Sequence, residues 1–428
     1  MKVGPSKNTY KQRGVGLIEI MIAMTLGIVV VLGITTLFAD TSRSLASVDR
    51  SGRQMENALF TLELLAAELS LGGYWGGANY PVDAETQIFV LGEVPASVPS
   101  ELSWNIATES PPACLGVGRY IANTSNNAKA ELAFAMEYPL FAASGASLNE
   151  EITAGKCGGT VTALAHESSH YFVIRRAGSC ATGAPPVPLL NRCRPLGDYF
   201  HLQANGCYSE NLGLSGGEIK LEKVNDTNVD ELLPYTSFDC ESPAPIYRLV
   251  SRIYFIDQGG TLNRMYLDGA GGALGFTTEV LVEGVELLRF EWFVDTTGDG
   301  EYDRVTQTPD VVDWPNVIGV KIWTVVRSIE REPGYSDAAT YTIAGESWSV
   351  PANNKNFRRI VQSKTVYIAN IGGPGGGSVT AACFLARFTE NYHWAHLDIA
   401  GSAWDSTPKG ATGRPVGLLT RYLMDRAG

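Results

Sequence analysis

The sequence predicts an α+β fold in which one long N-terminal helix packs on a body rich in antiparallel strands. Three observations support this prediction. An apolar run from Val15 to Phe38 continues into a stretch with helical spacing of apolar residues. Later segments alternate apolar and polar residues with the period of a half-buried strand. The alternation of strand and helix patterns that marks a parallel sheet is missing.

Composition narrows the class of protein. The 428 residues include 45% hydrophobic and 18% charged residues, which excludes a disordered chain, a coiled coil and a collagen. The 33 Lys and Arg residues are outnumbered by 45 Asp and Glu residues, giving a formal net charge of -12. Binding to phosphate backbones needs a basic face, so this charge argues against nucleic acid as the main partner.

The N-terminus predicts a membrane anchor. Residues 1–14 carry four basic side chains and no acid, and the apolar run that follows contains one ionisable residue, Glu19. At ~1.5 Å per residue the run would extend ~36 Å, which is enough to cross a bilayer. The basic flank should stay in the cytoplasm and the remainder should lie outside. No signal-peptidase site of the A-x-A type follows the run near residues 38–43.

Glu19 is the informative residue of this segment, because a carboxylate within a lipid-spanning helix is expensive and is a functional candidate by default. The string RGVGLIE, residues 13–19, resembles the cleavage motif of type IV prepilins. The resemblance implies cleavage after Gly14, methylation of the new N-terminus at Val15, and neutralisation of a neighbouring subunit's terminal ammonium by Glu19. Val15 replaces the usual Phe. The alternative is a plain signal anchor with a stray Glu.

The helix is expected to continue to residue 72, where Gly72 and Gly73 end it. An apolar stripe along it should pack on a sheet. The stripe consists of Leu45, Val48, Met55, Leu59, Leu62, Ala66 and Leu69. Residues 53–76 resemble the corresponding helix of the PilW family of minor pilins, which ends in a similar Gly-Tyr motif. The expected organisation is a leader at 1–14, an assembly helix at 15–72 and a β-rich periplasmic domain at 73–368.

Six segments of the β-rich domain are predicted to be strands, and residues 95–112 and 178–197 are predicted to be loops because they are rich in Pro, Gly and Ser. The predicted strands are Glu131–Tyr138, Tyr171–Arg176, Ile246–Ile256, Val280–Asp295, Val317–Arg327 and Phe357–Ile368.

Six of the seven cysteines fall within this domain. Outside the inner membrane they can oxidise, so up to three disulfides are expected, and fifteen pairings stay open. The candidates are Cys114, Cys157, Cys180, Cys193, Cys207 and Cys240. A zinc site is disfavoured because the chain has no C-x2-C pair.

An acidic turn at residues 295–303 is the best metal candidate. Three aspartates stand at positions 1, 5 and 9 of an EF-hand-like Ca²⁺ loop, with Gly300 at position 6. The expected ligands are Asp295, Thr297, Asp299, Glu301 and Asp303. Thr306 replaces the bidentate Glu of position 12, and the flanks look like strands. The alternative is a hairpin turn that uses Asp and Gly for their backbone preferences.

Two enzyme-like motifs are interpreted as coincidental. His166–His170 matches H-E-x-x-H, but zinc chemistry needs that motif on a helix, and here it leads directly into a strand pattern. Gly213–Gly217 matches G-x-S-x-G, but a nucleophile elbow needs a buried strand before it and a helix after it.

The composition changes near residue 369. Residues 371–428 resemble the C-terminal end of M17 leucyl aminopeptidases, and 369–428 is expected to be a short α/β fragment of such an enzyme. The Lys, Asp and Glu motifs that hold two metals in that family are not found in this chain. Ala400 and Ala403 correspond to a wall of the substrate pocket. The predicted elements are a helix over 378–389, a strand over 395–399 and a helix over 415–426.

Together these features predict a non-catalytic PilW-like minor pilin that takes part in assembly or priming of type IV pili. Its expected partners are other minor and major pilins, the prepilin peptidase, the inner membrane and a tip adhesin, with no nucleic acid. It should lie in the inner membrane as a single-pass protein and in the pilus after assembly. The alternatives are a metalloaminopeptidase, on the C-terminal resemblance alone, and a pseudopilin of type II secretion.

Overall fold

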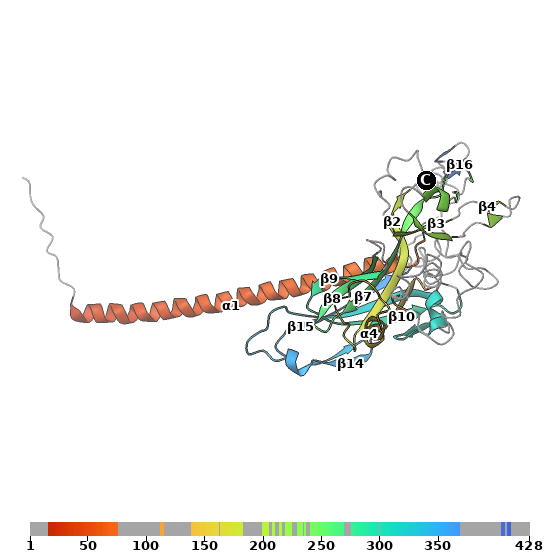
Figure 1. Ribbon diagram of the computed structural model, residues 1–428. Coiled ribbons are helices and arrows are strands. Elements are labelled where there is room, and N and C mark those ends of the chain that lie inside the picture. The colour runs from red at the N-terminus through yellow and green to blue at the C-terminus, as the bar shows by residue number, and fades with distance from the viewer. Residues whose placement is uncertain are drawn as a thin grey trace, which may run out of the picture.

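In the computed structural model a single long helix extends from a β-rich body (Figure 1). The description covers residues 16–75, 112–114, 138–161, 163–182, 199–204, 208–209, 214–215, 219–224, 229–233, 235–236, 240–268, 275–298, 300–368, 404–406 and 409–411. A long helix joined to antiparallel sheets is the α+β class predicted from the sequence, and that prediction is confirmed.

The long helix, α1, runs over Leu17–Ser70. It ends at Leu71, whose N–H donates to the carbonyl of Glu68, while the N–H of Gly72 donates to that of Leu69. Gly73 follows with a φ of 73°, which glycine adopts readily. Among the described residues, α1 is long and apolar enough to cross a membrane, as judged by length and composition alone. A long helix is thus present within the range predicted for it, over Leu17–Ser70 of 15–72.

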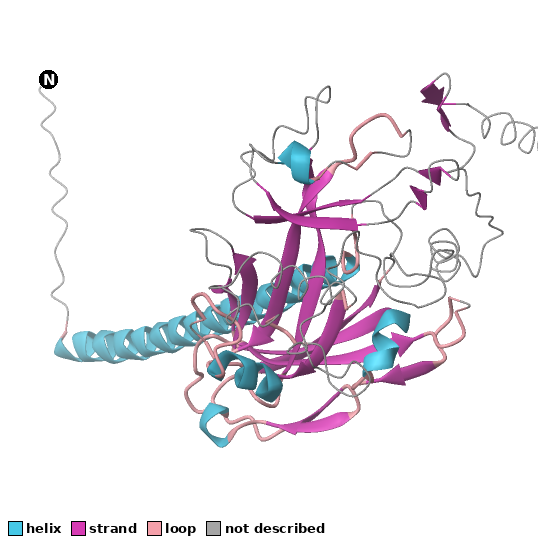
Figure 2. Cartoon of the chain, turned by 45° about the vertical axis from the view of Figure 1, so that its right-hand side comes forward, coloured by secondary structure: helices cyan, strands magenta, loops and turns pink. Residues whose placement is uncertain are grey.

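The first sheet of the body is fully antiparallel, with the strand order β1-β2-β7-β3-β6, and β8 and β9 extend it from β7. Figure 2 shows the strands of the body in magenta, gathered at one end of the long helix. Its strands are β1 (Leu140–Ser144), β2 (His170–Thr182), β3 (Tyr199–Ala204), β6 (Ile219–Val224), β7 (Ile246–Ile256), β8 (Thr261–Asp268) and β9 (Gly275–Glu283). The end of β7 near Ile246 pairs with β3, and the end near Ile256 pairs with β8.

The second sheet has the order β11-β10-β12-β15, and α1 lies against β12 and β15. Its strands are β10 (Val285–Val294), β11 (Arg304–Thr306), β12 (Val317–Arg327) and β15 (Arg359–Tyr367). The remaining elements are short: α4 (Gly145–Thr153), α5 (Val229–Leu232), the 3-10 helices η4 (Val311–Asn316) and η5 (Ala352–Asn354), and the strand pairs β4 (Tyr208–Ser209) with β5 (Leu214–Ser215), β13 (Thr340–Ile343) with β14 (Glu346–Ser349), and β16 (Trp404–Ser406) with β17 (Lys409–Ala411).

Aromatic rings join the two sheets in one core. Phe172 of β2 stacks on Tyr254 of β7 with ring centroids 4.9 Å apart, and meets Phe290 of β10 edge-on at 5.7 Å. Trp292 of β10 in turn meets Trp314 of η4 at 5.0 Å. These five rings are almost fully buried, so they supply a large share of the apolar area that holds the sheets together.

The single strand predicted over Val280–Asp295 is wrong. The segment forms parts of two strands, β9 and β10, which belong to different sheets. Gly284 separates them with a φ of 85°, and a Cβ at this position would lie 2.8 Å from the carbonyl oxygen of Arg327. The chain can therefore turn from one sheet to the other only at a glycine.

The predicted apolar stripe of α1 is correct in its last part only. Leu62, Ala66 and Leu69 are buried, whereas the earlier members are exposed. The exposed members are Leu45, Val48, Met55 and Leu59. The body meets the helix only from Gln54 onward, and the buried face there consists of Gln54, Ala58, Thr61, Leu62, Leu65, Ala66, Glu68 and Leu69.

Several other predicted elements fall outside the described residues. Residues 131–137 of the strand predicted at Glu131–Tyr138 are among them, and the first described strand, β1, begins at Leu140. The three elements predicted for the C-terminal fragment lie outside as well. The described part of that fragment is the strand pair β16 and β17.

Candidate functional site

The first turn of α1 carries the candidate assembly residue. The carboxylate of Glu19 accepts a hydrogen bond from the backbone N–H of Gly16 at 3.1 Å, and both residues are exposed. This contact satisfies one of the N–H groups that the start of a helix leaves free. Gly14 and Val15 lie outside the described residues.

Around Glu19, the first half of α1 presents apolar side chains on all sides. From Leu17 to Phe38 the large hydrophobic residues are between 46% and 77% exposed. A contiguous apolar surface of this size needs lipid or other apolar helices as its surroundings. Glu19 is the acidic residue of this surface, so its charge has to be solvated or paired there.

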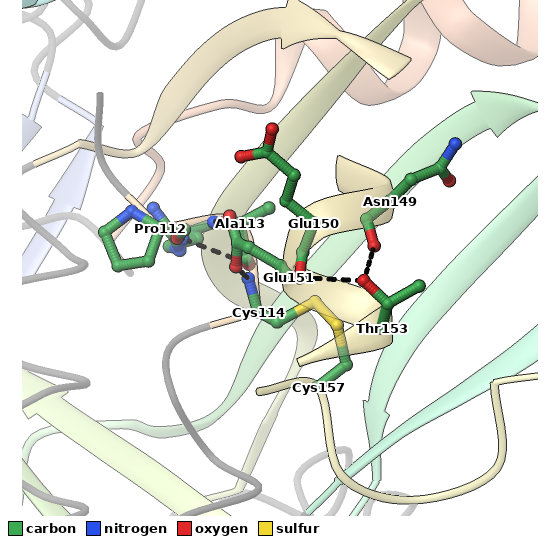
Figure 3. Close-up of a disulfide and its surroundings, with 9 residues drawn as sticks. Pro112, Ala113, Cys114, Asn149, Glu150, Glu151, Thr153 and Cys157 are labelled. Atoms are coloured by element: carbon green, nitrogen blue, oxygen red, sulfur yellow. Dashed lines mark hydrogen bonds between the residues drawn. A yellow bond between two sulfur atoms is a disulfide. The ribbon is translucent and has the colours of Figure 1, made fainter. Parts of the chain in front are cut away.

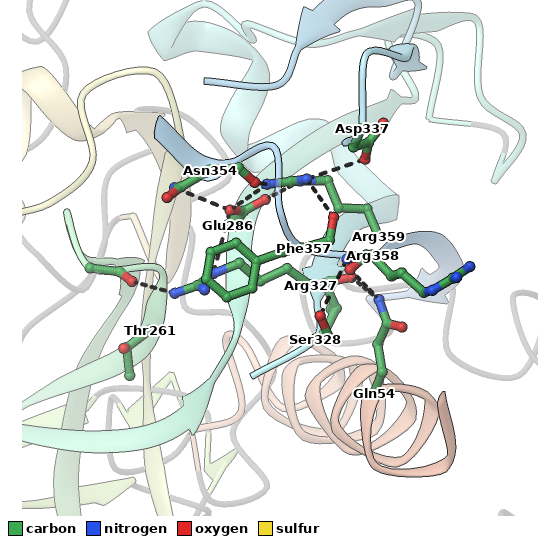
Figure 4. Close-up of polar contacts among 12 residues, drawn as sticks. Gln54, Thr261, Glu286, Arg327, Ser328, Asp337, Asn354, Phe357, Arg358 and Arg359 are labelled. Atoms are coloured by element: carbon green, nitrogen blue, oxygen red, sulfur yellow. Dashed lines mark hydrogen bonds and ion pairs between the residues drawn. The ribbon is translucent and has the colours of Figure 1, made fainter. Parts of the chain in front are cut away.

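Two buried polar side chains, Gln54 and Glu68, hold the second half of α1 on the body. The side-chain amide nitrogen of Gln54 donates to the carbonyl oxygens of Val326 at 2.7 Å and Arg358 at 2.9 Å (Figure 4). Further along, the carboxylate of Glu68 accepts from Arg252 at 2.5 Å and lies 3.5 Å from Arg176. These contacts fix the helix against the second sheet and, at its end, against the first.

Beside Gln54, a buried ion cluster organises the loops between β12 and β15 (Figure 4). The fully buried guanidinium of Arg359 binds both carboxylate oxygens of Glu286, at 2.6 and 3.0 Å, and Asp337 at 3.2 Å. Burial alone would raise the pKa of Asp337, but the Ala339 N–H, the Tyr341 hydroxyl and Arg359 together hold it below its usual value. The remaining N–H groups of the Arg359 guanidinium donate to the carbonyls of Phe357 at 2.9 Å and Asn354 at 2.7 Å, so all of its donors have acceptors. A buried guanidinium satisfied in this way is typical of a structural role.

A disulfide fastens residues 112–114 to the body beside α4 (Figure 3). It joins Cys114 to Cys157, and the carboxylate of Glu151 accepts hydrogen bonds from the N–H groups of Ala113 and Cys114 at 2.8 and 2.9 Å. Burial raises the pKa of Glu151, although these bonds oppose the shift. Cys180 and Cys240 are also disulfide-bonded, whereas Cys193, Cys207 and Cys383 lie outside the described residues. Disulfide bonding of this domain is therefore confirmed.

Next to this disulfide, Arg175 of β2 has its guanidinium in a fully buried position. It donates to the backbone carbonyls of Tyr138 at 2.9 Å and Pro112 at 2.8 Å. Burial lowers the pKa of Arg175 to about 9, against the attraction of Glu151. The side chain thus joins two distant segments of backbone, which is a structural function.

The acidic turn at 295–303 binds its own backbone. The carboxylate of Asp295 accepts from the N–H groups of Gly298 at 2.6 Å and Gly300 at 2.8 Å, and that of Asp303 accepts from Thr296 at 2.7 Å. Asp299 lies outside the described residues. Over the residues that are described, no group of three His, Cys, Asp or Glu side chains is placed to hold a metal. The contacts are those of a hairpin turn, and Ca²⁺ binding through Asp295, Thr297, Asp299, Glu301 and Asp303 stays a prediction.

Neither enzyme-like motif has the geometry its chemistry needs. His166 lies in a turn, with its Nδ1 3.0 Å from the Ser168 hydroxyl, while His170 is in β2 and stacks on Phe290. The two rings therefore do not share a helix face. Ser215 of the second motif is in β5, which pairs with β4. Ala400 and Ala403, the predicted remnant of a substrate pocket, lie outside the described residues.

Comparison with family models gives three matches. Residues 9–35 match the prokaryotic N-terminal methylation motif, and residues 253–370 match the type IV pilus-assembly protein W (PilW) model. Residues 334–420 match the catalytic domain of the cytosol aminopeptidase family, M17. The last two matches overlap over 334–370, a stretch that includes β15, which pairs with β12 along its whole length.

Curated proteins similar to part of the chain include aminopeptidases. Probable cytosol aminopeptidases of Pseudomonas syringae pv. syringae (strain B728a) and Ralstonia nicotianae (strain ATCC BAA-1114 / GMI1000) are each 61% identical, over 84 and 82 residues. Each match covers 19% of this chain, and 17% and 16% of those proteins. The chain therefore spans about a sixth of the length of the curated relatives it matches.

Among solved structures, a type IV-like pilin from Thermus thermophilus matches with 18% identity and a TM-score of 0.21, over 29% of this chain and 67% of that one. The family models by themselves find an N-methylation motif and a PilW-type segment in one chain with a fragment of an M17 aminopeptidase. The resemblances inferred from the sequence, to PilW-type minor pilins and to the C-terminal part of M17 aminopeptidases, are therefore confirmed.

Sequence reasoning missed the contacts that hold α1 on the body. Gln54 and Arg359 were not singled out, although both are buried and polar. The burial of Gln54 could have been predicted from helical spacing. Gln54, Ala58, Thr61 and Leu65 are separated by four, three and four residues, so they lie on one face of the helix, and this face is buried.

Proposed function

We propose that this protein is a PilW-like minor pilin that takes part in the assembly or priming of type IV pili and is not itself a catalyst. The observation that carries the proposal is Glu19, the lone acid in the apolar run of α1 from Leu17 to Phe38, inside the match to the N-methylation motif. Support comes from the exposed apolar surface of that half, which the protein's own body does not cover.

The proposed processing follows from the position of Glu19. The prepilin peptidase would remove residues 1–14 by cutting between Gly14 and Val15, and the amino group of Val15 would be methylated. Within the membrane the positive terminus of one subunit and the Glu19 carboxylate of another are each unfavourable alone and stabilise each other as a pair. The pairing therefore favours insertion of this subunit among other pilin helices.

The proposed topology puts the apolar run of the assembly helix, residues 15–38, in the inner membrane, and the domain at 73–368 in the periplasm. After assembly the helix at 15–72 would lie in the core of the pilus. The partners would be other minor pilins, the major pilin and a tip adhesin. The buried contacts of Gln54 and Glu68 hold α1 on the body at fixed points, so the body would follow the helix as a rigid unit.

The test of processing is the intact mass of the protein extracted from membranes of cells with and without prepilin peptidase. The proposal expects loss of residues 1–14 and addition of one methyl group in cells with the peptidase only. A Gly14→Val variant serves as the matched control and should keep its leader. An uncut wild-type protein in peptidase-positive cells would contradict the proposal.

An aminopeptidase activity is the second candidate, and the match over residues 334–420 favours it. We propose that the segment is inactive here, because the Lys, Asp and Glu motifs that would hold two metals are missing from the sequence. The test is release of amino acids from a leucyl substrate by the full chain with added Mn²⁺ or Zn²⁺. Robust turnover would reverse the ranking of the two functions.

A pseudopilin of type II secretion would share the N-terminal motif. An experiment therefore has to distinguish a role in the pilus from a role in the secretion complex. The match of residues 253–370 to the PilW model favours the pilus. Detection of the protein in sheared pili of wild-type cells supports this assignment. Detection only in a secretion complex would overturn it.

A further inference from the structure

A cleft lined by arginines lies on the face of the first sheet that also receives the end of α1. It has a volume of about 330 Å³, within the usual size range of small-ligand sites. We call it the arginine cleft and define it by the side chains of Arg248, Arg252, Arg264, Tyr266 and Glu279, from β7, β8 and β9.

Strand register places these side chains on one face. Arg252 is directly opposite Tyr266, and Arg264 is directly opposite Glu279. Arg248 stands four residues before Arg252 on β7, so it points to the same side of the sheet. Three guanidinium groups therefore gather over neighbouring strands.

The charges of the cleft are only partly balanced. Arg252 is paired with Glu68 at 2.5 Å, and Arg264 with Glu279 at 2.5 Å. Arg248 lies over the ring of Tyr199, 3.5 Å from its centroid, and within the described parts of the chain no carboxylate pairs with it. Three positive and two negative groups leave a net charge of +1, in a chain whose formal net charge is -12.

The geometry leaves donors available for a ligand. Stacking on Tyr199 occupies a face of the Arg248 guanidinium, while the N–H groups lie along its edge and point elsewhere. The Arg264 side chain is 20% exposed, whereas that of its partner Glu279 is 46% exposed. An anion that entered the cleft could take the place of this carboxylate and leave Glu279 in water.

We propose that the arginine cleft binds a small oxyanion, a carboxylate or phosphate group, through the guanidinium edges of Arg248 and Arg264. Arg252 would stay paired with Glu68 and add positive potential at the base. Guanidinium groups bind planar and tetrahedral oxyanions through paired N–H donors, and partial burial strengthens such contacts relative to open water. This site is separate from the assembly residues of α1 and does not depend on the proposed function.

The proposal is tested on the full chain in detergent, with sodium citrate and inorganic phosphate as probes, at an ionic strength matched with sodium chloride. Binding is measured by calorimetry and by the shift in melting temperature. Saturable binding of citrate, of phosphate or of both supports the site, and the relative affinities tell which oxyanion it prefers. Binding of neither probe overturns it.

Three variants decide whether the cleft is the site. Arg248→Gln and Arg264→Gln should each weaken binding at least tenfold, and Arg358→Gln, at an exposed ion pair with Glu332 outside the cleft, should bind as the wild type does. Glu279→Gln should bind several-fold more tightly, because the competing carboxylate is gone. If Arg264→Gln does not fold, Arg248→Gln decides. Wild-type affinity in Arg248→Gln, or no gain in Glu279→Gln, contradicts the proposal.

Discussion

The side-chain amide of Gln54 joins α1 to β12 through a buried hydrogen bond of 2.7 Å to the carbonyl oxygen of Val326 (Figure 4). The same nitrogen donates to the carbonyl oxygen of Arg358. Gln54 is 4% exposed and is the first buried residue of the helix, so it marks the point at which α1 meets the body. The preceding half of the helix is exposed and available to lipid and neighbouring helices.

Replacing Gln54 by Leu should destabilise the body, because two buried carbonyl groups would lose their donor. A loss of about 1–3 kcal/mol is expected for such unsatisfied groups. The measurement is urea unfolding of the full chain in detergent. Glu56→Gln, an exposed change two residues further along α1, is the control and should have little effect. Equal stability of both variants would contradict the assigned role of Gln54.

Replacing Glu68 by Gln should leave Arg176 and Arg252 without their carboxylate at the end of α1. Breaking a buried ion pair typically costs about 3 kcal/mol or more. Glu63→Gln removes a surface pair with Lys364, and should cost less than about 1 kcal/mol. Chemical unfolding of the two variants provides the comparison, and a larger loss in Glu63→Gln would disprove this ordering.

Removing the disulfide with the double variant Cys114→Ser, Cys157→Ser should lower stability. The two cysteines are 43 residues apart, and closing a loop of that length is worth up to about 4 kcal/mol in the chain-entropy account. The expected result is a lower melting temperature and faster proteolysis near residue 114. An unchanged melting temperature would mean that the Glu151 and Arg175 contacts hold this segment without the disulfide.

His170 should make stability depend on pH. Burial, with a smaller effect of Arg289, lowers the pKa of His170 to about 4 in the folded protein, from the usual 6.5. Between these values the unfolded chain binds a proton that the folded chain does not, so stability is full above pH 6.5 and falls as the pH drops toward 4. A His170→Phe variant should lose part of this dependence. Parallel pH profiles of urea midpoints for both proteins would contradict the assignment.

The sequence predicted some strands to the residue and failed at others for a physical reason. Ile246–Ile256 and Val317–Arg327 match β7 and β12, because turn residues border each apolar run. The run from 280 to 295 predicts one strand because apolar residues continue across Gly284, and the turn there is revealed by the φ of 85° at that glycine.

Some residues of the candidate sites could likewise be predicted from the sequence, and others could not. Glu19 is recognisable because one charge within an apolar run is a local feature of the sequence. The partners of Gln54 and Arg359 are not, because Val326 lies 272 residues from Gln54 and Glu286 lies 73 residues from Arg359. Only the fold brings such pairs together.

The most direct test of the assembly role is the amount of Glu19→Ala protein in sheared, purified pili, relative to its amount in membranes. Glu19→Asp, which keeps the charge, and Glu56→Ala, outside the apolar run, are the matched controls. The account predicts that Glu19→Ala is stable in the membrane fraction and lost from pili, while Glu56→Ala is incorporated normally and Glu19→Asp at least in part. Incorporation of Glu19→Ala at the wild-type level would contradict it.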